Sequence, residues 1–133
     1  MKPAQVIVIA ICLLLSATLL LAAAGDGLWV TKVPDKDRSR PNPFDASPAA
    51  QTAGAKLFKQ NCSSCHGDHA EGKGHHPSLL TERVNSATPG ELEWLLTNGS
   101  MKNGMPSWSR LPEQQRWQIV SFLKTLQPSS TAK

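Results

Sequence analysis

The sequence predicts an all-α fold of about three main helices joined by long loops. Residues 49–61, 88–98 and 112–126 carry apolar residues at the spacing of a helix face. The stretches between them are rich in glycine, proline and histidine, which indicates loops. Within the 133-residue chain, these elements predict one small domain over residues 49–128.

The charge balance is mildly basic, with 14 Lys and Arg against 10 Asp and Glu. No run of basic residues with interleaved aromatic side chains is present, which excludes a nucleic-acid-binding composition. A folded region of about 80 residues buries little apolar surface by itself. A cofactor at its centre would supply the missing burial.

Residues 1–24 are predicted to be a signal peptide or an N-terminal membrane anchor. Lys2 provides a positive start, an apolar run follows, and Ala22 to Ala24 are small residues suited to cleavage. Residues 6–24 are also nearly long enough to span a bilayer, which takes about 20 apolar residues. Both interpretations stay open. Either one places the domain on the periplasmic side of the cytoplasmic membrane, soluble after cleavage or anchored by residues 6–24.

Residues 25–48 are predicted to be a proline-rich linker. They contain mixed charges, no helical periodicity and four prolines, Pro34, Pro41, Pro43 and Pro48. Because proline lacks a backbone N–H and its ring obstructs the preceding turn, we expect no helix here. The segment is expected to be a tether if residues 1–24 are retained and a loose arm if they are removed.

The first helix is expected over residues 49–61, with Leu57 and Phe58 on its apolar side. Gly54 lies four residues before Phe58 and therefore on the same face. A glycine inside a helix costs up to about 1 kcal/mol relative to alanine. We therefore expect Gly54 to permit close contact with another element, namely the last helix.

Directly after this helix, Cys62 and Cys65 are separated by two serines, and His66 follows at once. This pattern is typical of covalent attachment of a c-type haem. The two thiols lie about one helical turn apart and can both face one porphyrin edge. A redox dithiol would need a βαβ context, which is missing. A zinc site remains an alternative, because the loop over residues 67–80 contains enough further nitrogen ligands: His69, His75 and His76.

The second helix is expected over residues 88–98, which open with a strong start signal. Thr88 can cap the helix, Pro89 suits the first helical position, and Glu91 can close a capping box. Leucines form the buried stripe. Gly99 is expected to end the helix.

Residues 98–111 form a second loop with two methionines, Met101 and Met105. A methionine in a loop rich in glycine and proline is poorly placed for core packing, and thioether sulfur is a soft ligand that suits haem iron. We favour Met105 as the ligand, because Pro106 limits its backbone conformations. Ligation by Met101, and packing of both methionines without ligation, are the alternatives.

The last helix is expected over residues 112–126. Pro112 suits the first position, and Glu113 complements the helix dipole there. Apolar side chains along the helix form a broad surface for the core. Pro128 stops the helix, and residues 129–133 are predicted to be a tail.

Several further residues match one family in order and spacing: Gly54, Leu57 and Phe58, His76 to Leu79, Asn98 and Gly99, Gly104 to Pro106, Arg116 and Trp117, and Phe122 and Leu123. With the cysteine motif, residues 49–126 resemble a class I c-type cytochrome of the small single-haem bacterial kind. The resemblance implies thioethers from Cys62 and Cys65. It implies that His66 is the proximal iron ligand and Met105 the distal one. It further implies that the Pro77 carbonyl accepts the other ring N–H of His66.

A haem iron with one histidine and one methionine ligand, besides the four porphyrin nitrogens, has six ligands and no open position. Such an iron passes single electrons. We therefore expect a one-electron carrier, not an enzyme, with one covalently attached haem c per chain. Its expected partners are a redox donor and acceptor, including membrane-bound respiratory complexes. The exposed lysines that would steer an acidic partner are Lys56, Lys59, Lys73 and Lys102. Two alternatives stay open: a five-coordinate haem sensor or peroxidase-like enzyme, and a haem subunit of a larger oxidoreductase complex.

Overall fold

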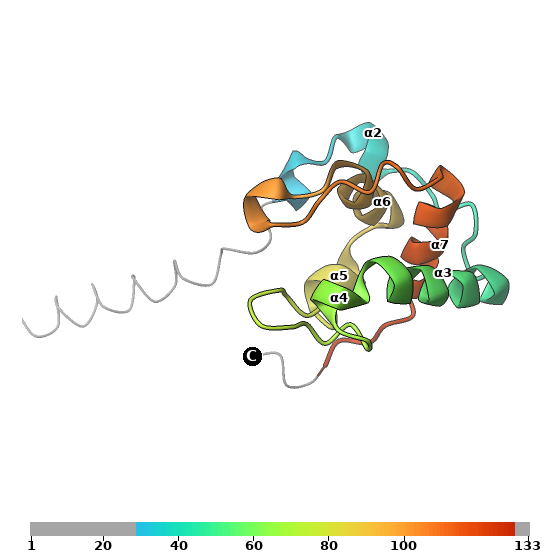
Figure 1. Cartoon of the computed structure of the whole chain (residues 1–133). Helices are drawn as coiled ribbons and strands as arrows, with labels where there is room; N and C mark the ends of the chain where they lie inside the picture. The colour runs from blue at the N-terminus through green and yellow to red at the C-terminus, as the bar shows by residue number, and fades with distance from the viewer. Residues whose placement is uncertain (1–28, 130–133) are drawn as a thin grey trace, which may run out of the picture. The chain divides into compact units, whose positions relative to one another are not determined.

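The structure is a computed structural model that describes residues 29–129. Its helices are η1 Val30–Lys32, α2 Asp35–Arg38, α3 Pro48–Asn61, α4 Ser63–His66, α5 Glu82–Ser86, α6 Pro89–Asn98, η2 Met101–Asn103 and α7 Glu113–Leu123 (Figure 1). Residues 29–129 contain no strand, only two isolated β-bridges. The predicted all-α class is confirmed. Residues 33–129 form one compact unit, and residues 29–32 do not belong to it.

The predicted signal peptide or anchor over residues 1–24 lies outside the described residues, as do residues 130–133. In the part of the chain that is described, no helix is long and apolar enough to cross a membrane. An anchor over residues 6–24 therefore stays a prediction.

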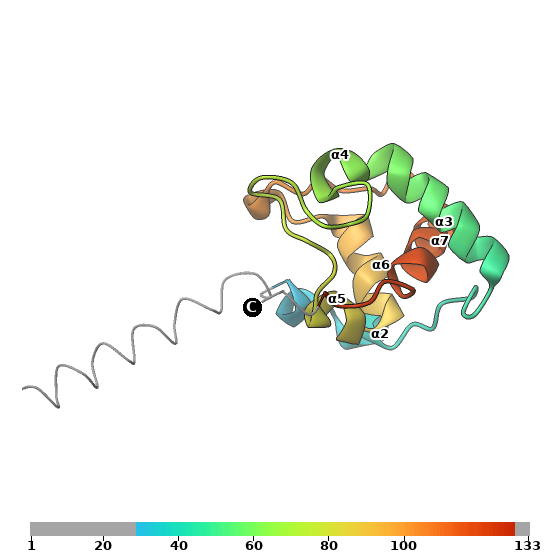
Figure 2. The ribbon, with the colours of Figure 1, turned by 90° about the horizontal axis from the view of Figure 1, so that it is seen from below.

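Helices α3 and α7 form the centre of the core and lie side by side (Figures 1 and 2). They approach so closely that a β-carbon added to Gly54 would lie 1.9 Å from the carbonyl oxygen of Gln118. One turn further along, the ring centroids of Phe58 and Phe122 are 5.2 Å apart. The expected close contact of Gly54 with the last helix is confirmed, and Phe58 packs against the same helix.

Helix α6 begins and ends where its sequence signals predict. The Thr88 side chain accepts the N–H of Glu91, and the Glu91 carboxylate accepts the N–H of Thr88 at 2.7 Å, which completes the capping box. Gly99 follows the helix with φ +69°, a conformation that favours glycine. This end of α6 leads directly into the loop that carries the two methionines.

Two helices differ from the sequence expectation. α7 runs from Glu113 to Leu123, so Pro112 precedes the helix and the turn after Leu123 is not helical. Pro112 makes no side-chain cap, because its ring has no hydrogen-bond acceptor. The short helix α5 was not predicted; the Thr81 hydroxyl caps it by accepting the N–H of Val84.

The segment predicted to be a loose linker packs on the domain from Val33 onward. We call residues 33–47 the N-terminal strap. Its helix α2 forms one turn directly after Pro34, so the expectation that prolines exclude a helix here is wrong. Pro34 precedes the turn instead of interrupting it, and its fixed φ suits a helix start. Further along, the Asn42 amide donates to Ser121 Oγ on α7 at 2.9 Å.

The strap also touches α6 through its backbone. A β-carbon added to Gly90 would lie 2.0 Å from the carbonyl oxygen of Asp37. Beside it, Thr88 Oγ1 donates to the carbonyl oxygen of Arg38 at 2.8 Å. The first turn of α6 is therefore covered by backbone, and only a glycine at position 90 leaves room for it.

We expect Gly90→Ala to lower the free energy of unfolding by about 1–3 kcal/mol, the usual cost of overpacking a close contact. The added carbon meets the strap backbone, which cannot rotate away as a side chain can. Thermal unfolding measures the loss, and limited proteolysis should reveal new cleavage within residues 33–47. Wild-type stability together with an uncut strap would contradict the contact.

Candidate functional site

The cysteine motif begins at the end of α3. Cys62 ends this helix, and its carbonyl oxygen accepts the N–H groups of Cys65 at 3.1 Å and His66 at 2.9 Å. Short helix α4 thus follows with both cysteines about one turn apart. Both are free thiols and half-buried. Burial, with a smaller contribution from Cys65, raises the pKa of Cys62 to about 11, so its sulfur stays protonated at neutral pH.

The ring orientation of His66 is set by the loop that follows it. Nδ1 of His66 lies 2.9 Å from the carbonyl oxygen of Pro77, the two atoms that the resemblance pairs. A carbonyl only accepts, so Nδ1 must carry the proton, and Nε2 of the neutral ring keeps its lone pair. This arrangement is the one that a metal-ligating histidine needs.

Backbone hydrogen bonds hold Pro77 in place. Gly72 N–H donates to the carbonyl oxygen of His66 at 2.6 Å, and Leu79 N–H donates to that of Ala70 at 2.8 Å. Both sides of the loop are thereby tied together around Pro77. Because the Pro77 carbonyl is held by the chain itself, it can orient His66 without help from another molecule.

The further histidines of this loop do not assemble a metal site. His69 and His75 are exposed, and the rings of His75 and His76 lie against each other with centroids 4.1 Å apart. Among residues 29–129, no group of three or more His, Cys, Asp or Glu side chains could hold a metal ion. The zinc alternative therefore gains no support from the structure.

Met105 and Met101 occupy different parts of a tight hairpin. Ser100 and Met105 exchange two backbone hydrogen bonds, of 2.8 Å and 3.2 Å, and Gly104 closes the turn in the left-handed conformation. Met105 is half-buried at the base of this hairpin, whereas Met101 lies in η2 with 72% of its surface exposed. The backbone thus restrains Met105 more than Met101.

The hairpin is fastened to the end of α6. Trp108 N–H donates to the carbonyl oxygen of Leu96 at 2.8 Å, and Ser107 Oγ donates to that of Thr97 at 2.6 Å. A β-carbon added to Gly99 would lie 2.8 Å from the carbonyl oxygen of Met105. The last turn of α6 thus holds the two residues after Pro106, and Gly99 leaves room for the backbone of Met105.

These residues fit a haem c by the chemistry of their donors. Two thiols stand one turn apart, an imidazole has its Nδ1 committed to a carbonyl, and a thioether is held in a restrained hairpin. Figure 1 shows α4 and the hairpin on the same side of the domain, one below the other. Apolar side chains on these and adjoining elements are only half-buried: Leu57, Leu79, Leu80, Leu95, Trp108 and Leu111.

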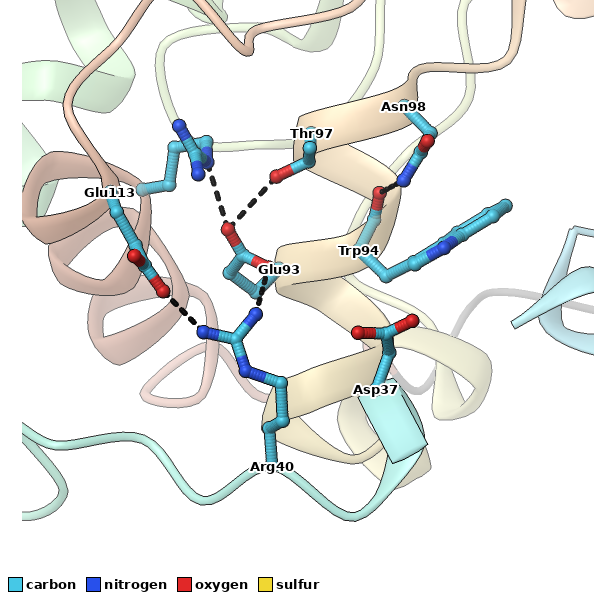
Figure 3. Close-up of a pocket in the computed structure, with 8 residues that line it drawn as sticks. Asp37, Arg40, Glu93, Trp94, Thr97, Asn98 and Glu113 are labelled. Carbon is cyan, nitrogen blue, oxygen red and sulfur yellow. Dashed lines mark hydrogen bonds and ion pairs between the residues drawn. The ribbon is translucent and has the colours of Figure 1, made fainter. Parts of the chain in front are cut away.

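A polar hollow of about 390 Å³ lies apart from these residues. None of the residues predicted to bind haem lines it. Its lining comes from the strap, α6 and α7: Asp37, Arg40, Glu93, Trp94, Thr97, Asn98, Glu113 and Arg116 (Figure 3). The sequence does not predict that these side chains come together. The one residue that could have indicated this group is Glu93, a carboxylate directly after Leu92 on the buried side of α6.

Comparison with known proteins identifies relatives of the folded part. A family model described as cytochrome c oxidase, cbb3-type, subunit III matches residues 49–123. The quinohemoprotein alcohol dehydrogenase ADH-IIG of Pseudomonas putida is 36% identical over 85 residues, which are 61% of this chain and 11% of the dehydrogenase. The crystal structure of cytochrome CL from Methylophaga aminisulfidivorans aligns with a TM-score of 0.58 at 26% identity, covering 65% of this chain and 59% of the other. This chain thus spans less than two thirds of both relatives.

Proposed function

This chain belongs to the class I c-type cytochromes, which are electron-transfer haem proteins, and we propose that it is a one-electron carrier with a single covalent haem c. The proposed attachment is through Cys62 and Cys65. The observation that carries the proposal is the complete cysteine–histidine motif, combined with the hydrogen bond from His66 Nδ1 to the Pro77 carbonyl. When bound, the haem supplies a ferric/ferrous couple.

His66 and Met105 are the proposed iron ligands. The Pro77 carbonyl keeps Nε2 of His66 available, and the Ser100–Met105 hairpin limits the movement of the thioether. Both restraints are made by backbone groups of this chain, so they persist when the redox state changes. Two fixed ligands leave no position for substrate, which supports electron transfer rather than turnover.

The proposed partners are a redox donor and acceptor on the periplasmic side of the cytoplasmic membrane. The dehydrogenase relative, named as a quinohemoprotein, makes a dehydrogenase a reasonable class of donor. Exposed lysines favour an acidic surface on the partner: Lys56, Lys59, Lys73 and Lys102. Residues 1–24 are proposed to direct export, whether cleaved or retained as an anchor, and residues 49–128 to form the haem domain.

A haem subunit of a larger oxidoreductase complex is the second candidate. It is favoured by the dehydrogenase relative, in which a segment like this chain makes up only 11% of a much longer protein. Co-purification from membranes with a larger partner would separate this candidate from a free shuttle.

Replacing Cys62 and Cys65 together by alanine tests the covalent attachment. We expect the wild-type pigment to stay with the polypeptide in acidified organic solvent, and the double variant to lose it, because thioether bonds resist extraction. An intact-mass measurement of the wild type should show the added haem and also whether residues 1–24 are present. Pigment that extracts from the wild type would contradict the proposal. Ready carbon monoxide binding by the reduced protein would instead favour a five-coordinate sensor or peroxidase.

A further inference from the structure

Glu93 is a buried carboxylate with three partners on three parts of the fold. Only 3% of the residue is exposed. Oε1 accepts from Arg116 Nε at 2.8 Å and from Thr97 Oγ1 at 2.9 Å, and Oε2 accepts from Arg40 Nη1 at 3.2 Å. Figure 3 shows the Arg40 guanidinium between Glu93 and Glu113. A buried charge of this kind is tolerated only while its donors stay in place.

Arg116 connects this carboxylate to the segment after Met105. Its side chain is 11% exposed, and Nη1 donates to the carbonyl oxygen of Leu111 at 2.5 Å. It also reaches the carbonyl oxygen of Ser109 at 3.5 Å. One guanidinium therefore holds Glu93 with one edge and the backbone of residues 109–111 with another.

Thr97 provides a second connection. Its hydroxyl donates to Glu93, while its backbone carbonyl accepts Ser107 Oγ at 2.6 Å. Ser107 is two residues after Met105. Both ends of residues 107–111 are thus linked to groups that the Glu93 carboxylate orients.

Arg40 reaches the same carboxylate from the N-terminal strap, outside residues 49–123 that match the family. Its guanidinium also pairs with Glu113 and lies 5.1 Å from the ring centroid of Trp117. The hydrogen bond from Arg40, followed by one from Trp117 Nε1, holds the pKa of Glu113 below its usual value. Arg40 is therefore fixed by several groups, and its charge stays beside Glu93.

We propose that Arg40, Glu93 and Arg116 are positioning residues for the distal ligand, so that the N-terminal strap helps determine how firmly Met105 is held. This inference rests on the proposed ligation by Met105. If Arg40 is lost, Oε2 of Glu93 loses its donor, and the carboxylate reorients at the expense of Arg116 and Thr97. Residues 107–111 then loosen, and the thioether is displaced more easily.

The chain contains a matched control for this network. Glu91 is a second buried carboxylate on α6, and it pairs with Arg38 of the same strap. Glu91 serves the N-terminal capping box of α6, at the end of the helix away from Thr97. Changes at Arg38 and Glu91 therefore disturb an ion pair between the strap and α6 in a similar way, but at the end of the helix that does not carry Thr97 and its contact with Ser107.

The test is the affinity of free imidazole for the oxidised haem protein, because imidazole competes with the distal thioether. We expect Glu93→Gln to tighten imidazole binding about tenfold, equivalent to about 1.4 kcal/mol, on the order of one charge-assisted hydrogen bond. For Arg40→Gln we expect imidazole binding to tighten about threefold, since the Arg40 side chain is partly exposed. In Arg40→Lys the affinity for imidazole should return toward the wild-type value. Arg38→Gln and Glu91→Gln should stay within about 1.5-fold of the wild type.

Hydrogen exchange of the Trp108 amide gives a readout that does not depend on the iron ligand. It should accelerate in Glu93→Gln and Arg40→Gln but not in the two control variants. Equal imidazole affinities in the Glu93 and Glu91 variants, or unchanged Trp108 exchange, would overturn the proposed positioning. If the Met105→Ala variant has the same absorbance spectrum as the wild type, the assignment of Met105 as the ligand is wrong. The exchange of the Trp108 amide would still show whether Glu93 positions residues 107–111.

Discussion

We expect the replacement of Met105 by alanine to remove the long-wavelength absorbance band that would report ligation of the iron by methionine sulfur in the oxidised protein. We also expect the reduction potential to fall by on the order of 0.2 V, within the range of about 0.8 V over which axial ligands set haem potentials. The physical reason is that thioether sulfur is a soft ligand that favours the reduced iron, and water or hydroxide in its place favours the oxidised iron. Visible spectroscopy and a redox titration measure the two effects.

Met101→Ala is the matched control for this experiment. Met101 lies in η2 with 72% of its surface exposed, so its removal should leave both the band and the potential unchanged. Met105 is restrained by two backbone hydrogen bonds with Ser100, which makes it the better ligand candidate. Loss of the band in Met101→Ala alone would reverse the assignment. Absence of the band from the wild-type protein would exclude ligation by either methionine.

Replacing Gly54 by alanine is expected to cause a large loss of stability in this domain. The added β-carbon would lie 1.9 Å from the Gln118 carbonyl oxygen and 3.0 Å from Phe122 Cβ. Alanine gains about 1 kcal/mol in helix propensity over glycine, but separating two packed helices costs more. We expect a net loss of about 2–3 kcal/mol, which lowers the melting temperature of a domain this small by roughly 10–20 °C.

Thr52→Ala serves as the control, because Thr52 lies on the exposed side of the same helix. Its free energy of unfolding should stay within about 0.5 kcal/mol of the wild-type value, which keeps the melting temperature within a few degrees. Thermal unfolding followed by circular dichroism measures both variants. A Gly54→Ala protein as stable as the wild type would show that α3 and α7 can separate without cost, against the close packing described here.

Features that depend on neighbouring residues were predictable from the sequence. The capping box of α6 joins Thr88 to Glu91, three positions apart, so its pattern is visible in four residues. The motif from Cys62 to His66 is equally local. Gly54 was recognised because a glycine inside a helix is unfavourable unless a neighbour requires it.

The N-terminal strap was not predictable in this way. Its three prolines and mixed charges are typical of a linker, and the contacts that hold it join residues far apart in the chain. Arg40 and Glu93 are separated by 53 positions, and Asn42 and Ser121 by 79. No local periodicity reports such pairs, so the packing of residues 33–47 on α6 and α7 emerges only from the fold.

By itself the sequence determined the helical class, the start of α6 and the chemical groups offered to a haem, because these follow from residue type and short spacing. The tertiary structure alone decided that Met105 is restrained while Met101 is exposed, and that Glu93, through Arg116 and Thr97, joins the strap to the loop after Met105. Each of these depends on chain segments that meet only after folding, since hydrogen bonds and ion pairs require atoms within about 3 Å whatever their distance in sequence.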